Sequence, residues 1–368
     1  MLVSLLYLAF NYKAEIPFKK HQFYRQVYDA LYNEHKLAQG QKPHEKRSKL
    51  DIDDFNRVLR YVGYECLISI GVQFDKDTIL ASIKRAKVFC ENLKFSESDF
   101  LKDLMTSVPL FSKDGTEYKW AHKSLMEYFA ARFIAEDAKD NQDMILSSIY
   151  NGSSIYKYIN MLDIYYDIDY KGFSKNIMLP FLENYQKYYD DHYPKSSNID
   201  KNLVEDRISL LYPFCLAGIT RKTYLKNGVK YGKRGLDFYS KNVKERWRST
   251  SYGYFDDFVM MGFMNYENLN TVYLSRLLLS KQPELFKRIK TSPQKIDGNL
   301  YKDNMIYKID FMTGENDINH FQLINFLLSE SNHHLNSYYF NFGAVKKKID
   351  KIKKEIELSK KQFNLLPK

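Results

Sequence analysis

The spacing of apolar residues predicts helices along most of the chain. An apolar run at 1–10 and a second stretch at 19–36 indicate two helices separated by Pro17. The second stretch places four apolar residues at roughly helical spacing: Phe23, Val27, Ala30 and Leu31. The polar stretch that follows, 38–49, is interrupted by Gly and Pro and is typical of an exposed linker.

The next stretch predicts three helices closed by a β-hairpin. The first begins at the N-cap Asp51 and ends before Gly71. Its apolar face comprises Ile52, Phe55, Val58, Leu59, Val62, Cys66, Leu67 and Ile70. A second helix is expected near 77–87, and a third opens with a capping-box-like pattern at 96–99. Two short strands then flank 113–116, a turn built on Asp-Gly, and this order is typical of a winged helix.

Beyond the hairpin the pattern is again helical. Residues 120–137 repeat large apolar side chains every four positions, at Leu125, Phe129 and Phe133. Residues 342–363 predict a Lys-rich amphipathic helix with Ile349, Ile352, Ile356 and Phe363 on its apolar face. We therefore expect a mainly α protein. It would comprise a small helical domain (1–50), a winged-helix domain with a short β-hairpin (51–138) and an all-helical C-terminal region (139–368).

Composition narrows the class of protein. The chain has 368 residues, of which 44% are hydrophobic, which is enough for two or three domains with sizeable cores. Its three cysteines are far apart and form no C-x-x-C pair, so neither a disulfide framework nor a zinc site is indicated. A reducing cytoplasm is the expected location. The apolar run at 1–10 is too short to span a bilayer, so we expect no membrane partner.

The formal net charge of +11 is placed unevenly. Residues 221–248 carry ten Lys or Arg against two acids, a net of +8, and residues 346–361 carry a net of +5. Any polyanion contact is therefore expected in the C-terminal half. The first stretch interleaves its basic residues with aromatic ones, so it is either a solvated helical face or a partner surface. Its candidate surface residues are Arg221, Lys222, Lys230, Lys233, Arg234, Arg246, Trp247 and Arg248.

One motif resembles a known family. The stretch 118–132 is similar to the aromatic-x-H-x-S-Φ-x-E-Y-x-A-A-R signature that ends the winged-helix domain of NACHT proteins, which are signalling ATPases of the STAND class. The matching residues are Trp120, His122, Ser124, Leu125, Glu127, Tyr128, Ala130, Ala131 and Arg132. The preceding order of a small helical domain and a winged helix fits the family as well. Residues 1–137 are covered well by the resemblance, and 138–368 only in being helical.

The resemblance implies roles for several residues. The histidine at this place in the family reaches the β-phosphate of bound ADP and holds the resting state closed, which implies the same role for His122. An imidazole at a helix start lies among unpaired backbone N–H groups, a setting that favours anions. Glu127 and Arg132 are expected to be structural polar contacts. The implied cofactor is ATP or ADP.

The chain departs from the family in one respect that decides its chemistry. It contains no G-x-x-x-x-G-K-[ST] loop and no strand ending in paired acids to hold magnesium. We therefore expect this chain not to be an enzyme by itself. Its expected partner is a nucleotide-binding domain in the same or an adjacent gene product, since Met1 falls about where that domain would end. Self-association on activation is also expected, and the trigger is not named by the sequence.

Two functional hypotheses stay open at this point. The leading one is the regulatory and sensor portion of a NACHT-like STAND NTPase, in microbial antiphage defence or signalling. The alternative is a stand-alone helical nucleic-acid-binding module that uses the basic and aromatic stretch 221–248. Binding of DNA through the winged helix is disfavoured, because the helix before the hairpin carries Glu97, Asp99 and Asp103 against Lys102 alone.

Overall fold

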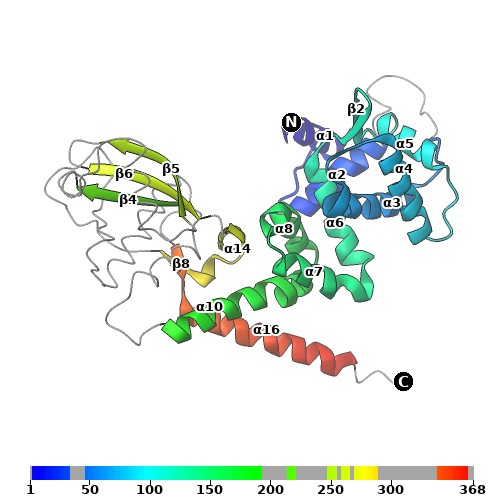
Figure 1. Ribbon diagram of the computed structural model, residues 1–368. Coiled ribbons are helices and arrows are strands. Elements are labelled where there is room, and N and C mark those ends of the chain that lie inside the picture. Colours follow the sequence, from blue (N-terminus) through cyan, green and yellow to red (C-terminus); the bar gives the residue numbers. More distant parts are fainter. Residues whose placement is uncertain are drawn as a thin grey trace. The chain divides into compact units, whose positions relative to one another are not determined.

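The structure is a computed structural model, and it describes residues 2–33, 46–192, 214–220, 247–254, 258–265, 269–288 and 338–363. The chain divides into two compact units (Figure 1). Unit 1 comprises Met1–Gly152 and Lys157–Met178, and unit 2 comprises Ser153–Tyr156 and Leu179–Lys368. The domain boundaries expected at residues 50 and 138 stay predictions. Among the described helices, none has the length and apolar character needed to cross a bilayer.

Unit 1 is built mostly of helices. These are α1 (Leu2–Lys13), α2 (Lys20–Asn33), α3 (Ile52–Glu65), α4 (Lys76–Phe89), α5 (Glu97–Met105), α6 (Lys123–Glu136), α7 (Gln142–Asn151), α8 (Ile159–Ile168) and α9 (Tyr170–Phe173). Short helical turns lie at η1 (Cys66–Ile70), η2 (Lys139–Asn141), η3 (Ile155–Tyr158) and η4 (Ser174–Met178), of which η3 crosses the boundary of the units. Its strands are β1 (Gln73–Phe74), β2 (Phe111–Asp114) and β3 (Glu117–Trp120).

The first two helices confirm the expectation for the N-terminal stretch. They are separated by a short loop that contains Pro17, and the buried Gln26 of α2 ties the loop in place. Its amide donates to the carbonyl oxygens of Ala9 at 2.6 Å and Glu15 at 2.8 Å. The four apolar residues expected on the inner face of α2 are all buried: Phe23, Val27, Ala30 and Leu31. Most of the expected linker, residues 38–45, lies outside the described residues.

Helix α3 begins as its sequence predicts. The Asp51 side chain caps the helix by accepting from the backbone N–H groups of Asp53 at 3.0 Å and Asp54 at 2.8 Å. After Glu65 the helix widens into the π-helical turn η1, which ends at Gly71 with φ +97°. The wider turn changes the direction in which the following side chains point. The prediction of one continuous α-helix as far as Ile70 is therefore wrong in this turn. Leu67 and Ile70 are half-buried rather than core residues.

Three helices and the β-hairpin follow one another as expected, and β1 adds a third strand that makes the sheet three-stranded. The strand order is β1-β3-β2, and the β2–β3 hairpin turns at Gly115, whose φ is +61°. Helix α5 begins at the N-cap Ser96, which accepts from the backbone N–H of Asp99. The hairpin expected around 113–116 is therefore present, with Lys113 and Asp114 in the strand rather than in the turn.

Helices α3 and α6 form the centre of unit 1. They approach closely at Gly63, where a Cβ atom, if one were added, would lie 2.7 Å from the Phe129 Cβ and 3.0 Å from the Met126 carbonyl oxygen. Any side chain at this position would therefore push the two helices apart. The periodic residues of α6 are buried as expected: Leu125, Phe129 and Phe133.

In the part of unit 2 that the structure describes, helices are combined with two small sheets. Its helices are α10 (Leu179–His192), α14 (Leu269–Lys281), the short turn η5 (Pro283–Leu285) and α16 (Phe342–Phe363). Its strands are β4 (Phe214–Thr220), β5 (Trp247–Tyr254), β6 (Phe258–Asn265), β7 (Phe286–Arg288) and β8 (Tyr338–Phe340). Strands β4, β6 and β5 pair in that order, antiparallel, and β7 pairs with β8.

The mainly α class is confirmed, and one part of it is corrected. The region after 139 was expected to be helical throughout, but it contains the sheet β4-β6-β5. Aromatic, Gly and Thr residues are frequent in these strands, and aromatic and β-branched residues favour extended structure over helix. The amphipathic helix expected at 342–363 has those same bounds in α16.

Candidate functional site

His122 lies between the hairpin and α6. It is the N-cap residue of α6, with an extended backbone (φ −143°, ψ 122°), and its carbonyl oxygen accepts from the N–H of Leu125 at 3.0 Å. Its imidazole makes no capping hydrogen bond. In the part of the chain that the structure describes, the ring has no hydrogen-bond or ion-pair partner. The half-buried imidazole is therefore available to a group from outside these residues.

The surroundings of His122 favour a neutral ring. Burial lowers the pKa of its imidazole below the usual 6.5. At neutral pH the ring therefore carries one N–H donor and one acceptor nitrogen. The first backbone N–H groups of α6 lie beside it, at the positive end of the helix dipole. This corner of unit 1 can donate hydrogen bonds to an anion without a fixed charge on the histidine.

The motif residue Glu127 makes structural contacts, as expected. Its carboxylate is buried, and it accepts from the Asn160 amide of α8 at 2.6 Å. The Lys123 ammonium lies 3.3 Å from the same carboxylate. A buried carboxylate needs such partners, because burying an uncompensated charge is strongly unfavourable. Glu127 therefore joins α6 to α8 and does not face a ligand.

Arg132 belongs to a network of charged and polar side chains that joins α3 to α6. Its guanidinium donates to both carboxylate oxygens of Glu136 at 2.7 Å, to Asn56 Oδ1 at 3.1 Å and to the Tyr128 hydroxyl at 3.3 Å. Although burial alone would lower the pKa of Arg132, these hydrogen bonds raise it, so the guanidinium stays charged. The expected structural role of Arg132 agrees with these contacts.

A second arginine completes this network. Arg60 of α3 donates to Asp137 at 2.5 and 2.9 Å and to Asn56 Oδ1 at 3.2 Å. Its guanidinium also lies 2.9 Å from Glu136. Both side chains of the Arg60–Asp137 pair are largely buried, with 11% and 17% exposed. Sequence reasoning missed this pair, because nothing in the spacing of residues 60 and 137 predicts that they meet.

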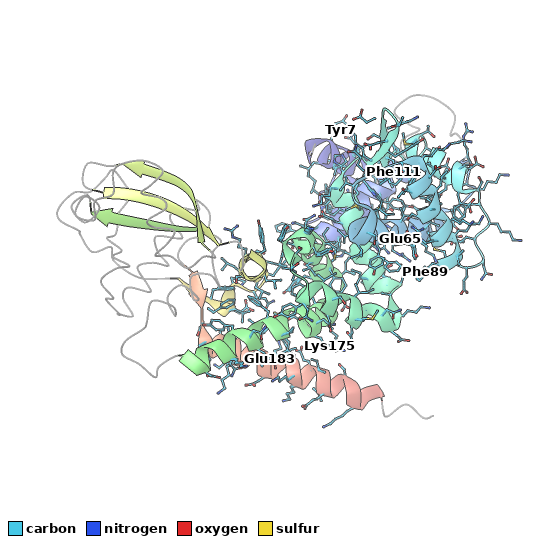
Figure 2. The ribbon with its side chains drawn as sticks, viewed as in Figure 1. Tyr7, Glu65, Phe89, Phe111, Lys175 and Glu183 are labelled. Atoms are coloured by element: carbon cyan, nitrogen blue, oxygen red, sulfur yellow. The ribbon has the colours of Figure 1, made fainter. Side chains whose placement is uncertain are left out.

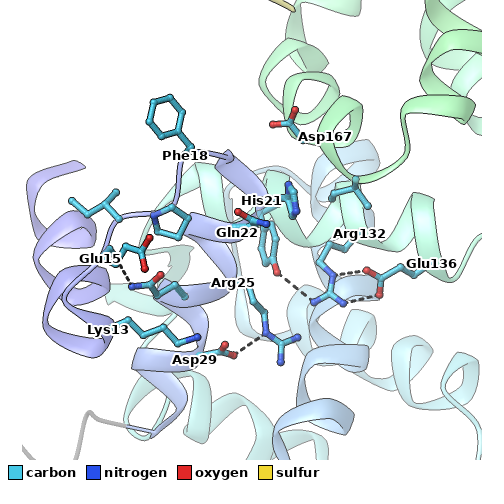
Figure 3. A pocket seen from close by; sticks show the side chains of 15 residues that line it. Lys13, Glu15, Phe18, His21, Gln22, Arg25, Asp29, Arg132, Glu136 and Asp167 are labelled. Atoms are coloured by element: carbon cyan, nitrogen blue, oxygen red, sulfur yellow. Dashed lines mark hydrogen bonds and ion pairs between the residues drawn. The ribbon is translucent and has the colours of Figure 1, made fainter.

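Unit 1 also contains a pocket of about 890 Å³. It is lined by the end of α1, the following loop, α2, and parts of α6 and α8 (Figure 3). Its two arginines are already held by carboxylates, Arg25 by Asp29 at 2.9 Å and Arg132 by Glu136. His122 is not among its lining residues. The pocket and the His122 corner are therefore separate places in unit 1.

Cys66 and Cys90 are both buried in unit 1. Burial raises the pKa of the Cys66 thiol to about 12 and that of Cys90 to about 11, so both thiols are protonated at neutral pH. Within the described ranges, no group of three or more His, Cys, Asp or Glu side chains could hold a metal ion.

The structure describes only part of the basic and aromatic stretch 221–248. Trp247 and Arg248 open β5, and the pairing of that strand with β6 is their only described feature. The other candidate surface residues lie outside the described residues: Arg221, Lys222, Lys230, Lys233, Arg234 and Arg246. The sheet itself was missed by sequence reasoning, although the aromatic and Gly-rich run 252–263 was a usable signal for strands.

Comparison with known proteins identifies the family. The short NACHT-associated C-terminal domain, family 5 (SNaCT5), matches residues 168–356, which is 189 of the 368 residues. The chain belongs to this family. No curated protein and no solved structure matches the chain. This match confirms that the chain is NACHT-associated, as the resemblance of residues 118–132 implied. The matched residues do not include that motif, so the two observations are independent.

Proposed function

We propose that the chain is the regulatory and sensor portion of a NACHT-like STAND NTPase, and that His122 clamps ADP in the resting state. The observation that carries the proposal is the half-buried imidazole at the N-terminus of α6, which no described residue engages, in a chain of the SNaCT5 family. In this proposal unit 1 contacts the nucleotide and unit 2 senses the trigger. The family description supports a NACHT nucleotide-binding domain as the partner.

The order of elements supports the interpretation of residues 51–138 as a winged helix. Helix α3 is followed by β1, α4, α5 and the β2–β3 hairpin, and β1 pairs with β3 at the sheet edge opposite β2. A small three-stranded sheet against three helices is what that domain type requires. The hairpin then leads directly to His122, so the wing and the histidine form one continuous segment.

The chemistry of His122 suits a phosphate. A neutral imidazole donates one N–H to a phosphate oxygen, and the backbone N–H groups at the start of α6 add donors of their own. A hydrogen bond to a charged group contributes about 1.5–3 kcal/mol. An equilibrium between closed and open states that differs by a few kcal/mol would respond to a contact of this size.

Binding of DNA by the winged helix is a poor alternative, for a structural reason beyond charge. The buried Asp103 of α5 accepts from the backbone N–H groups of Arg47 at 3.0 Å and Ser48 at 2.8 Å. The segment just before α3 therefore covers part of the helix that would have to enter a groove. Glu97 and Asp99 add negative charge to α5.

ATP turnover is proposed to require the nucleotide-binding domain, because the sequence lacks a phosphate loop. A cytoplasmic location and a role in microbial antiphage defence or signalling complete the proposal. Signalling would begin when a trigger weakens the hold on ADP, with self-association as the next step. Purified chain alone is expected to show no ATP hydrolysis above the level of a heat-denatured sample.

The test compares ADP affinity in the complete protein that includes the nucleotide-binding domain. His122→Ala should weaken ADP binding by about tenfold or more, since a loss of 1.4 kcal/mol is a factor of ten. Glu127→Gln serves as the control, because Glu127 contacts only protein groups and should change the melting temperature rather than the ADP affinity. Equal ADP affinity in wild-type protein and His122→Ala, measured per folded molecule, would refute the role of His122.

A further inference from the structure

The outward side of α16 carries a row of lysines with no acidic residue among them. At about 100° per residue, five positions from Lys347 to the end of the helix fall in a sector of about 80° opposite the buried face. They are Lys347, Lys351, Lys354, Leu358 and Lys361, and all are exposed. We name the four lysines the lysine face. The three acids of α16, Asp350, Glu355 and Glu357, lie to either side of this sector.

In the part of the chain that the structure describes, few side chains contact the lysine face. Among the described residues, Lys347, Lys354 and Lys361 have no hydrogen-bond or ion-pair partner. Lys351 lies 3.9 Å from Glu355, but both side chains are well exposed, so this contact is weak. By contrast, the Lys353 ammonium on the flank of the helix lies 2.7 Å from the carboxylate of Glu183 in α10. Glu183 is labelled in Figure 2. The lysine face therefore presents its charge to solvent.

The helix that carries these lysines is held in place by its opposite side. Val345, Ile349 and Ile352 are buried, and α16 packs against α10 and η5 within unit 2. Before the helix, the Tyr185 hydroxyl donates to the Phe340 carbonyl oxygen at 3.2 Å, and the Phe340 ring stacks on Phe286. A partner thus meets a preformed surface, and it does not have to order the helix.

We propose that the lysine face binds the phosphate backbone of a nucleic acid, independently of base sequence. From Lys347 to Lys361 the helix rises about 21 Å, a length over which a duplex presents about a dozen phosphates. Helix α16 contains no arginine, and its outward sector contains no aromatic residue. Bidentate contacts to guanine and stacking on bases are therefore absent from this face, while point contacts from lysine to phosphate remain.

Two other occupants fit the surface less well. A lipid surface would require an exposed apolar face, but the apolar face of α16 is buried against α10. The core of a protein interface is depleted in lysine, and Leu358 is the one large apolar side chain in the sector. The chemistry of the face therefore favours a polyphosphate chain over both.

The experiment measures binding of the whole chain to fluorescein-labelled duplex RNA and duplex DNA by anisotropy. Duplexes of about 20 base pairs exceed the helix length at 3.4 Å per base pair. The test variant is Lys347→Gln/Lys354→Gln/Lys361→Gln. The matched control, Lys76→Gln/Lys94→Gln/Lys171→Gln, removes three exposed lysines from unit 1 and changes the net charge equally. Circular dichroism checks that both variants keep their helix content.

The proposal predicts binding to either duplex that weakens as salt rises from about 50 to 200 mM. The α16 variant should lose affinity by about tenfold or more. The slope of the logarithm of affinity against the logarithm of salt concentration should become shallower by about 2 to 3, since each phosphate contact contributes about 0.9 to that slope. The unit 1 variant should bind nearly as wild type does. These outcomes do not depend on ADP, so they are separable from the role of His122.

Three results would overturn the proposal. One is equal loss of affinity in the α16 and unit 1 variants, which would indicate a non-specific effect of net charge. Another is a loss caused only by Lys230→Gln/Lys233→Gln/Arg234→Gln, which would move the contact to the stretch 221–248. The third is tighter binding to polyglutamate or to phosphatidylserine vesicles than to either duplex, with the same dependence on the lysine face.

Discussion

Unit 1 and unit 2 use their charged residues in opposite ways. In unit 1 three charged residues are directed inward: Arg60 meets Asp137, Arg132 meets Glu136, and Asp103 holds two backbone N–H groups. In unit 2 the lysine face of α16 points outward and, among the described residues, is unpaired apart from the weak contact of Lys351. These inward charges of unit 1 thus fix helices to one another, whereas the lysine face of α16 can meet a partner.

The contrast is clearest between two helices that both carry strong charge. Helix α5 is acidic, and part of it is covered by the segment that precedes α3 through Asp103. Helix α16 is basic, and its charged side is uncovered among the described residues. Net charge alone did not distinguish these cases. The two helices differ in whether their charged side chains bind other parts of the protein or face solvent. The following predictions test that difference.

The largest effect is expected at the buried ion pair of unit 1. Replacing Arg60 with Met leaves the Asp137 carboxylate buried without its partner, so the free energy of unfolding should fall by about 3 kcal/mol. Urea denaturation followed by circular dichroism measures this change. A fall below about 1 kcal/mol, the range of surface pairs, would contradict the inward role of these charges.

A smaller effect, with a matched control in the other unit, is expected at two glycines. Gly63→Ala places a methyl group 2.7 Å from the Phe129 Cβ, so overpacking should lower the free energy of unfolding by about 2 kcal/mol. Gly343→Ala in α16 meets nothing closer than 3.7 Å, so it should stabilise by up to about 0.5 kcal/mol through helix propensity. Thermal melts of both variants should therefore shift in opposite directions, and a shared direction would argue against tight packing at Gly63.

A titration of His122 should show a pKa below that of an exposed histidine, because burial disfavours the charged ring. The unfolded chain then binds more protons than the folded chain between the two pKa values. The stability contributed by the neutral ring is present above about pH 6.5 and is lost as the pH falls through the folded pKa. Two-dimensional NMR of the imidazole gives the pKa directly. His122→Gln should remove the part of the pH dependence of the unfolding free energy that comes from this ring. If the unfolding free energy of the variant depends on pH just as that of wild type does, the burial effect is refuted.

The smallest effect is expected on α16. Replacing Lys351 with Met breaks an exposed contact of 3.9 Å to Glu355, so the free energy of unfolding should change by less than about 0.5 kcal/mol. The comparison with Arg60→Met is the informative one, because both variants replace a cation by the same residue. A loss at Lys351 close to that at Arg60 would mean that α16 depends on its surface charges for folding.

Local signals in the sequence predicted much of unit 1. The N-caps Asp51 and Ser96, the turn at Gly115 and the inner face of α2 depend on residues within a few positions of each other, so spacing alone reveals them. Helix α16 was predictable for the same reason, since its apolar residues repeat at helical intervals, and two of those expected on the inner face, Ile349 and Ile352, are buried.

Features that depend on distant residues could not be predicted in this way. The Arg60–Asp137 pair joins residues 77 positions apart, and only the packing of α3 on α6 brings them together. The π-turn η1 shifts the apolar face of a sequence that otherwise fits one helix, so Leu67 and Ile70 were misplaced. In the sheet β4-β6-β5, the pairing of β4 with β6 joins strands far apart in sequence, which periodicity does not report.

The position of Asp137 bears on how the protein can be cut into smaller pieces for study. This residue lies one position beyond α6, where a fragment designed from helix boundaries alone would end. Such a fragment would leave the Arg60 guanidinium, 11% exposed, without the carboxylate that faces it. Fragments of unit 1 should therefore extend past Ala138, which is itself buried, so that the last turn of α6 keeps its contact with α3.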